Sequence, residues 1–260
     1  MEDQVTRLAE KVWESFQQTP PNSRYLIAVS GIPGSGIYIL IVLFPHIPIP
    51  QSLTKSALRQ TTLAATITKR LNALQDAHSN KTSLPPIAGF IPMDGYHLTR
   101  AQLSAMPDPA HAHARRGAEF TFDGPAFLSL IQRLREPLTP STITIHAPSF
   151  DHALKDPKAN DIPIEPTTRI LVFEGNYLSL NKEPWRSAAK LMDQLWFVDV
   201  DFEVAKKRLI PRHVKAGIAE NEEDAEKRVV ENDLVNGEDI VKGRMEVDEI
   251  IVSTNDVAWK

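Results

Sequence analysis

Three short segments of the sequence carry residues that can act on phosphate groups. The glycine-rich run GIPGSG, at residues 31–36, directly follows an apolar segment. Glycines let successive backbone N–H groups point at a phosphate, and a following helix adds its positive N-terminal end. PMDGYHL and LVFEGNYL place Asp94 and Glu174 after two other apolar runs. A carboxylate there can accept a proton from a reacting hydroxyl group or orient Mg²⁺, although a turn cap is the simpler alternative for Asp94.

The glycine-rich run departs from the complete phosphate-loop pattern, which continues with Lys and then Ser or Thr. Ile37 follows instead, and an apolar, proline-broken insertion extends to position 60. If the insertion loops out, Thr61 or Thr62 becomes the hydroxyl ligand of Mg²⁺, and Lys55 is the lysine within the insertion. The alternative is an ordinary glycine-rich turn between a strand and a helix.

Two basic segments add candidate substrate contacts. HARRGAEF places Arg115 and Arg116 on a glycine-containing loop, where adjacent guanidinium groups suit an anionic or hydroxyl-rich substrate. KKRLIPRHVKAG is a basic helix whose Arg208 and Arg212 can stabilise charge on a transferred phosphoryl group. A solvated charged surface is the alternative explanation of each segment.

The composition fits a globular protein. A chain of 260 residues with 42% hydrophobic and 24% charged residues can bury the core of one domain, or of a domain with a small lid. The net charge of −4 gives no broad basic surface for nucleic acid or an anionic membrane. The absence of cysteine excludes disulfides and thiolate metal sites. We expect a cytoplasmic protein with neither nucleic-acid nor membrane partners.

Alternating apolar strands and helices must position these residues. Continuous apolar runs, typical of buried parallel strands, occur at 24–30, 85–94, 168–175 and 193–201. The alternation predicts an α/β fold, a mostly parallel sheet with helices on both faces. Ligands of such sheets bind beyond the C-terminal strand ends, where all three segments lie. Helices are expected at 3–18, 61–75, 122–136, 183–192, 201–218 and 221–234, with further strands at 141–150 and 247–253.

In this order, the motifs resemble the phosphoribulokinase/uridine kinase/bacterial-type pantothenate kinase branch of the P-loop kinases, in particular its nucleoside- or sugar-kinase-like subgroup. The resemblance runs from about residue 24 to residue 252 and also uses TTLA, RRGAEFTFD, APSFDH, WFVDVD and RHVKAGI. It implies a P-loop NTPase three-layer fold with a small helical lid. It also implies an ATP- and Mg²⁺-dependent kinase that phosphorylates a hydroxyl group of a nucleoside, sugar or pantothenate-like molecule.

The resemblance implies roles for matching residues. Asp94 would be the base that activates the acceptor, Glu174 would help order Mg²⁺, and Arg208 and Arg212 would belong to the lid. Phosphates would be cradled by Gly31, Gly34, Ser35 and Gly36. The acceptor would be faced by Tyr96 and Arg116, beside the polar His97 and Arg115. Asn232 and Asn236 would lie near the nucleotide.

The predicted organisation is an N-terminal helix at 1–20 and a P-loop kinase domain at 24–255, with the insertion at 37–60 and a lid at about 205–222. The insertion removes the loop lysine, and losing one preorganised stabilising contact typically costs about 2.7–4 kcal/mol. A retained intron or faulty translation of the gene would explain its unusual composition. A nucleotide-binding protein or weak ATPase with impaired transfer, and a scaffold protein, are the alternatives. A homodimer is compatible with the N-terminal helix.

Overall fold

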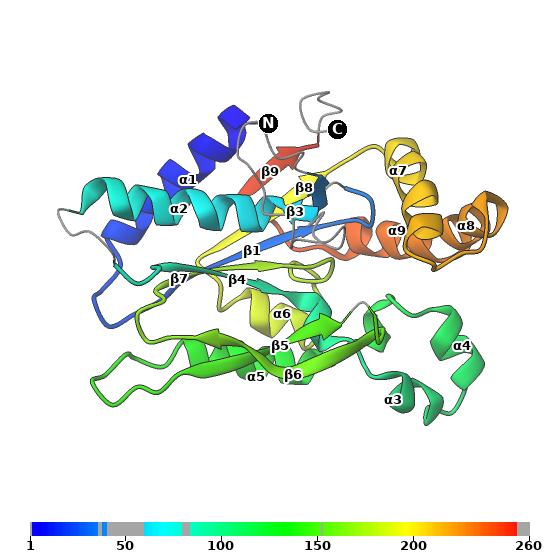
Figure 1. Ribbon diagram of the computed structural model, residues 1–260, viewed down its shortest axis with the longest axis horizontal. Coiled ribbons are helices and arrows are strands. Elements are labelled where there is room, and N and C mark those ends of the chain that lie inside the picture. Colours follow the sequence, from blue (N-terminus) through cyan, green and yellow to red (C-terminus); the bar gives the residue numbers. More distant parts are fainter. Residues whose placement is uncertain (1, 36–37, 41–59, 80–83, 152, 254–260) are drawn as a thin grey trace, which may run out of the picture.

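The computed structural model describes residues 2–35, 38–40, 60–79, 84–151 and 153–253, without the side chains of residues 2, 38–40 and 60–62. Its centre is a sheet in the order β4-β7-β1-β8-β9, in which every pair of neighbours is parallel. The strands are β1 (Tyr25–Gly31), β4 (Ala88–Pro92), β7 (Ile170–Glu174), β8 (Gln194–Asp199) and β9 (Glu249–Val252). The predicted parallel α/β sheet is confirmed (Figure 1).

The sheet is covered on both faces because its central strands are apolar at successive positions. Every residue of β1 and β7 is buried. Leu26 and Ala28 of β1 join one hydrophobic cluster, whereas Ile27 and Val29 join the other. This period of two places alternate side chains on opposite faces, which gives the molecule its three layers.

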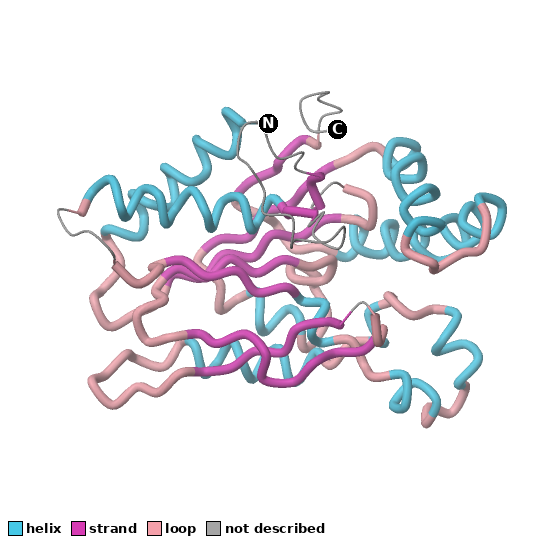
Figure 2. The backbone as a smooth tube through the Cα atoms, viewed as in Figure 1, coloured by secondary structure: helices cyan, strands magenta, loops and turns pink. Residues whose placement is uncertain are grey.

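Helices α1 (Glu2–Gln17) and α2 (Leu63–His78) cover one face. The apolar stripe of α1 packs into the same cluster as Ile67 and Leu71 of α2. The other face carries α5 (Gly124–Leu134) and α6 (Trp185–Ala189), and Asp123 caps α5 by accepting a hydrogen bond from the Ala126 N–H. Figure 2 shows helices on both sides of the strands.

A hairpin and two short helices lie beside this sandwich. Strands β5 (Ile145–Asp151) and β6 (Asp156–Ile164) pair antiparallel, and α3 (Arg100–Ser104) and α4 (Pro109–Ala114) precede them along the chain. The sequence predicts β5 but not β6, whose segment DPKANDIPI is largely exposed and contains two prolines. Pairing with β5 outweighs its weak intrinsic strand propensity.

A helical region follows β8. It consists of α7 (Phe202–Lys215), α8 (Glu222–Arg228), the π-helix η3 (Val229–Asp233) and α9 (Leu234–Gly243). The side chains of Asp201 and Asn221 cap α7 and α8. The predicted helix at 221–234 therefore divides into α8 and the π-turn that joins α9. No helix of the described ranges is long and apolar enough to span a membrane.

The two described ends of the insertion pair with each other. Strand β2 (Tyr38–Leu40) pairs antiparallel with β3 (Gln60–Thr62), so that Tyr38 lies opposite Thr62. Helix α2 begins at the next residue, Leu63. The two ends of the insertion thus lie side by side directly before α2. Gly36 and Lys55 lie outside the described residues.

Candidate functional site

The phosphate loop, Glu174 and Asp94 follow three adjacent strands. Glu174 is the register partner of Val29 in β1 and of Pro92 in β4. Gly31 ends β1 two residues beyond Val29, and Asp94 lies two residues beyond Pro92. Because neighbouring strands lie about 4.8 Å apart, this register brings the two acids and the loop to one edge of the sheet.

The phosphate loop is packed against the start of α7. Gly34 has a φ of +80°, and a Cβ atom there would lie 2.8 Å from the carbonyl oxygen of Ala205. Position 34 therefore requires glycine for its backbone conformation and for its close contact. The Nη1 of Arg208 donates hydrogen bonds to the Gly34 carbonyl at 3.2 Å and to Ser253 Oγ at 2.9 Å. Burial lowers the pKa of Arg208, which still remains a cation at neutral pH.

Ser35 gives the clearest sign that this loop suits a ligand. Its side chain is buried, and its Oγ has no hydrogen-bond partner within the described part of the chain. A buried hydroxyl group without a partner is costly, and a phosphate oxygen would accept its hydrogen bond. The loop residues described here therefore fit a nucleotide phosphate. Thr61 and Thr62 are placed by their backbone alone, in β3.

Glu174 is a buried carboxylate, 4% exposed, at the end of β7. The next residue, Gly175, donates its N–H to the Val29 carbonyl at 3.1 Å, and a Cβ atom on it would lie 2.3 Å from Met93 Cβ. Only glycine allows Met93 to pack this closely against the chain directly after Glu174. Across the described residues, no group of three or more His, Cys, Asp or Glu side chains could hold a metal. A Mg²⁺ ion at Glu174 would therefore take most of its ligands from nucleotide phosphates and water.

Asp94 lies in a short 3₁₀ turn, η1 (Met93–Tyr96), directly after β4. The turn packs so closely against β5 that a Cβ on Gly95 would lie 2.2 Å from the Pro148 carbonyl oxygen. The predicted acceptor residue Tyr96 lies in the core, edge-to-face with Phe127, and burial raises its pKa.

The aromatic ring of His97 packs between two phenylalanines. Its centroid lies 4.0 Å from that of Phe122 and 5.0 Å from that of Phe150, and Nδ1 lies 2.9 Å from the Asp94 carbonyl oxygen. His97 thus supports the turn that carries Asp94, while Tyr96 anchors that turn in the core.

The two neighbouring arginines contact different elements. Arg116 donates from Nη2 to the Leu98 carbonyl at 3.2 Å and pairs with Asp156 at 3.1 Å. Arg115 donates instead to the side-chain oxygens of Asn232 and Asn236, at 2.9 and 2.7 Å. Arg116 thus lies on the Asp94 side, whereas Arg115 joins its loop to η3 and α9. The side chains of Asn232 and Asn236, expected near the nucleotide, hold Arg115.

Within the helical region after β8, α7 is connected to η3. His213 of α7 is buried, and its Nε2 lies 2.8 Å from Asp233 Oδ2. Arg212 is half-buried one residue earlier. Sequence reasoning missed Arg228, Asp156 and Asp233 as parts of this network, because charged residues are frequent in these segments and no spacing distinguishes them.

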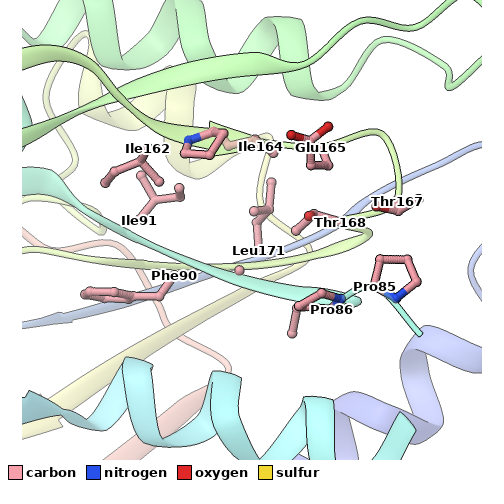
Figure 3. Close-up of a pocket in the computed structure, with 13 residues that line it drawn as sticks. Pro85, Pro86, Phe90, Ile91, Ile162, Ile164, Glu165, Thr167, Thr168 and Leu171 are labelled. Carbon is pink, nitrogen blue, oxygen red and sulfur yellow. The ribbon is translucent and has the colours of Figure 1, made fainter. Parts of the chain in front are cut away.

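An apolar pocket lies away from this edge. It is a cavity of about 250 Å³ between the first halves of β4 and β7 and the end of β6. Figure 3 shows its aliphatic wall, which includes Ile91, Ile162 and Leu171. Asp94 and Glu174 do not line it, so the pocket and the strand-end site are distinct.

A glycine-rich loop after the central strand of a parallel sheet, with acids at or just beyond the ends of two adjacent strands, is the arrangement typical of P-loop kinases. No protein-family model matches the chain. The ATP-dependent kinase-like protein notR′ of Aspergillus versicolor is 58% identical over 159 residues, which are 61% of this chain and 92% of that protein. The chain belongs to this family of ATP-dependent kinase-like proteins, of the uridine kinase type.

Two further proteins agree with this assignment. A Schizosaccharomyces pombe protein named as a candidate uridine kinase is 46% identical over 150 residues, which are 58% of this chain and 63% of that protein. The chain therefore spans less than two thirds of this relative. The solved structure of YFH7 from Saccharomyces cerevisiae, described as a candidate P-loop kinase with a circular permutation, shares the fold. Its TM-score is 0.76 at 23% identity, over 97% of this chain and 99% of that chain.

Proposed function

We propose that this chain is a kinase that transfers the γ-phosphoryl group of ATP to a hydroxyl group of a small molecule. One observation carries the proposal: the strand register brings Asp94, Glu174 and the phosphate loop to one edge of the sheet. The resemblance to nucleoside and sugar kinases, and the name of the S. pombe relative, support a nucleoside, sugar or pantothenate-like acceptor.

In this proposal, each group has one task. The phosphate loop, with Gly31, Gly34, Ser35 and Gly36, cradles the phosphates through its free backbone N–H groups, with Ser35 Oγ as an additional donor. Glu174 and a threonine at 61 or 62 would hold Mg²⁺, which would neutralise phosphate charge when bound. Asp94 accepts the proton of the acceptor hydroxyl as its oxygen bonds to the γ-phosphorus. The bond from that phosphorus to the oxygen of the leaving ADP breaks in the same displacement.

Two arginines of the proposed lid, at about 205–222, supply positive charge. Arg208 already contacts the phosphate loop through the Gly34 carbonyl. Arg212 follows one helical turn later on α7. With lysine absent from position 37, these cations are the groups that we expect to stabilise charge on the transferred phosphoryl group.

A second candidate function, nucleotide binding or weak ATP hydrolysis without transfer, is favoured by one observation. Ile37 stands where the loop lysine is expected. The two functions differ in their dependence on an acceptor, because ATP consumption by a kinase rises when its acceptor is added, whereas that of a weak ATPase does not.

The test uses the full chain with Mg·ATP and a panel of nucleosides, sugars, sugar phosphates, hydroxy acids and pantothenate. We expect release of ADP that requires one class of acceptor and yields an equal amount of phosphorylated product. ADP release that no acceptor changes would favour the weak ATPase. Failure of Mg·ATP to bind would contradict both.

A further inference from the structure

Four arginines lie close together where the loop that follows α4 meets α8: Arg100, Arg115, Arg116 and Arg228. Asp156 accepts hydrogen bonds from both Arg100 and Arg116. Burial opposes the ionisation of Asp156, but hydrogen bonds from these two arginines outweigh it and lower its pKa. Arg115 contacts only the oxygens of two asparagines. Arg228 donates from Nη2 to the Arg116 carbonyl at 3.1 Å, with no carboxylate in ion-pair contact among the described residues.

Other acids of this region are engaged elsewhere. The Oδ2 of Asp233 contacts His213 Nε2 at 2.8 Å. Glu119 holds Lys182 and accepts a hydrogen bond from Trp185 Nε1. The carboxylate of Asp156 is thus shared between Arg100 and Arg116.

Two N–H groups of this cluster have no acceptor among the residues that the structure describes. The Nε atoms of Arg116 and Arg228 are buried and have no hydrogen-bond partner in the described part of the chain. The side chain of Arg116 is 17% exposed and Arg228 is half-buried, so both side chains keep some exposed surface. A guanidinium group recognises planar or tetrahedral oxyanions through paired N–H donors.

The cluster lies on the acceptor side of the proposed site. Arg116 donates to the carbonyl of Leu98, four residues after Asp94. Its Cζ also lies 5.7 Å from the centroid of Phe150, the ring that packs against His97. These contacts connect Arg116 to the turn that carries the proposed base.

We propose that Arg116 and Arg228 bind an oxyanion of the acceptor. The acceptor is then an anionic hydroxy compound, either a sugar phosphate or a hydroxy acid, rather than a neutral nucleoside. This inference rests on the proposed kinase function and specifies its substrate class. Recognition uses the charge and the donor geometry shared by phosphate and carboxylate groups.

The first experiment is a calorimetric titration of inorganic phosphate into full-length protein saturated with Mg·AMP-PNP, which occupies the phosphate loop. We expect wild type to bind phosphate and Arg228→Gln to bind it about tenfold more weakly or worse, as the loss of a charge-assisted hydrogen bond implies. Arg228→Lys, which keeps the charge but not the fork, falls between them. Lys227→Gln removes the same charge from the exposed neighbouring position of α8, and its affinity stays within about twofold of wild type.

Melting temperatures of the variants show whether Arg228→Gln is folded. If that variant melts early, Arg228→Lys provides the comparison, because it retains a cation at the same position. Unchanged phosphate affinity in both folded variants, or no phosphate binding by wild type, would overturn the inference.

The second experiment measures transfer to D-ribose 5-phosphate, D-glycerate and uridine, which separates phosphate, carboxylate and neutral acceptors. We expect kcat/KM to favour one anionic acceptor, with Arg228→Gln raising KM for that acceptor and leaving KM for ATP unchanged. A preference for uridine that Arg228→Gln does not alter would overturn the inference. Failure of AMP-PNP to bind would sink the kinase function alone, because phosphate binding that depends on Arg228 would still identify the subsite.

Discussion

The two halves of the proposed site are held in place in different ways. On the nucleotide side, Gly31 and Glu174 are placed by the register of β1 and β7, which are buried at every position, and Gly34 is placed by its close contact with α7. On the acceptor side, Arg115 and Arg116 are placed by side-chain hydrogen bonds to Asn232, Asn236 and Asp156. The first half is built from backbone pairing, and the second from long polar side chains on loops and short helices.

This difference suggests a division of tasks. Backbone geometry suits phosphates, which every nucleotide shares, because N–H groups of a loop need no particular side chains. Side chains on loops suit an acceptor that differs between kinases, because loops tolerate substitution without disturbing the sheet. The π-helix η3 belongs to the second half, and π-turns occur frequently at functional sites.

The largest effect is expected from removing the proposed base between the two halves. Asp94→Asn should lower phosphoryl transfer about 10²–10⁴-fold, the usual contribution of general base catalysis, while Mg·ATP still binds. The assay is ADP release with the acceptor that the proposed panel identifies. The control Asp76→Asn removes a charge from the exposed end of α2 and should leave the rate unchanged. Transfer at the wild-type rate in Asp94→Asn would eliminate the assigned role.

A substitution in the phosphate loop tests the rigidity of the nucleotide half. Gly34→Ala should destabilise the protein by about 1–3 kcal/mol and weaken ATP binding, because its Cβ would collide with the start of α7. Urea unfolding and calorimetry measure these changes. Gly217→Ala is the matched control, since Gly217 also has a positive φ, +62°, but has no atom within 4 Å of its added Cβ. Equal ATP affinities in the two variants would show that contact with α7 does not shape the loop.

The acceptor half is tested by breaking the contacts of Arg115. Arg115→Met should cost about 1–3 kcal/mol of folding free energy, because it leaves the buried Asn236 Oδ1 without its donor and Asn232 Oδ1 with only the 3.4 Å hydrogen bond from Asn236 Nδ2. Asn236→Leu should lose less energy when Arg115 is already methionine than in the wild-type protein. Additive losses in this double-mutant cycle, measured by urea unfolding, would mean that the contact does not couple the loop to α9.

A contact remote from both halves should produce the smallest effect. Arg7 and Lys11 of α1 contact Glu249 of β9 at 3.0 and 2.6 Å, and the hydrogen bonds from Arg7 are the main reason that the pKa of Glu249 is lowered to about 2. Because a depressed carboxyl pKa stabilises the folded state above the unfolded value, the contribution is present above pH 4.5 and is lost between 4.5 and about 2. Glu249→Gln should cost about 1 kcal/mol at pH 7, since the two cations are 55% and 41% exposed.

The measurement is urea unfolding of wild type and Glu249→Gln at pH 7 and pH 3. The difference between them should shrink at the lower pH, while Mg·ATP affinity at pH 7 should be equal. A difference that grows as the pH falls would contradict the assigned cause.

The nucleotide half could be predicted from the sequence because its signals are local. An apolar run followed by glycines or by an acid marks each strand end, and β1, β4 and β7 occur where such runs predicted them. The parallel order of these strands follows from the alternation of strands and helices.

The acceptor half could not be predicted in detail because its contacts join distant segments. Arg115 bonds Asn236, 121 positions away, and Arg228 reaches the Arg116 carbonyl, 112 positions away. Strand β6 forms only against β5, and Tyr96 lies in the core although its motif suggested a place beside the acceptor. Residue type gives the polarity of these segments, but tertiary packing decides which side chain faces the site.

We expect the strand-end edge to bind Mg·ATP even though position 37 is not a lysine. The melting temperature of the full chain, and of Asp94→Asn, measured with increasing Mg·ATP, tests this expectation. At a ligand concentration of about 100 Kd, binding adds about 2.7 kcal/mol to the folded state, so both proteins should melt at clearly higher temperatures. A melting temperature that Mg·ATP leaves unchanged in wild type would contradict this expectation.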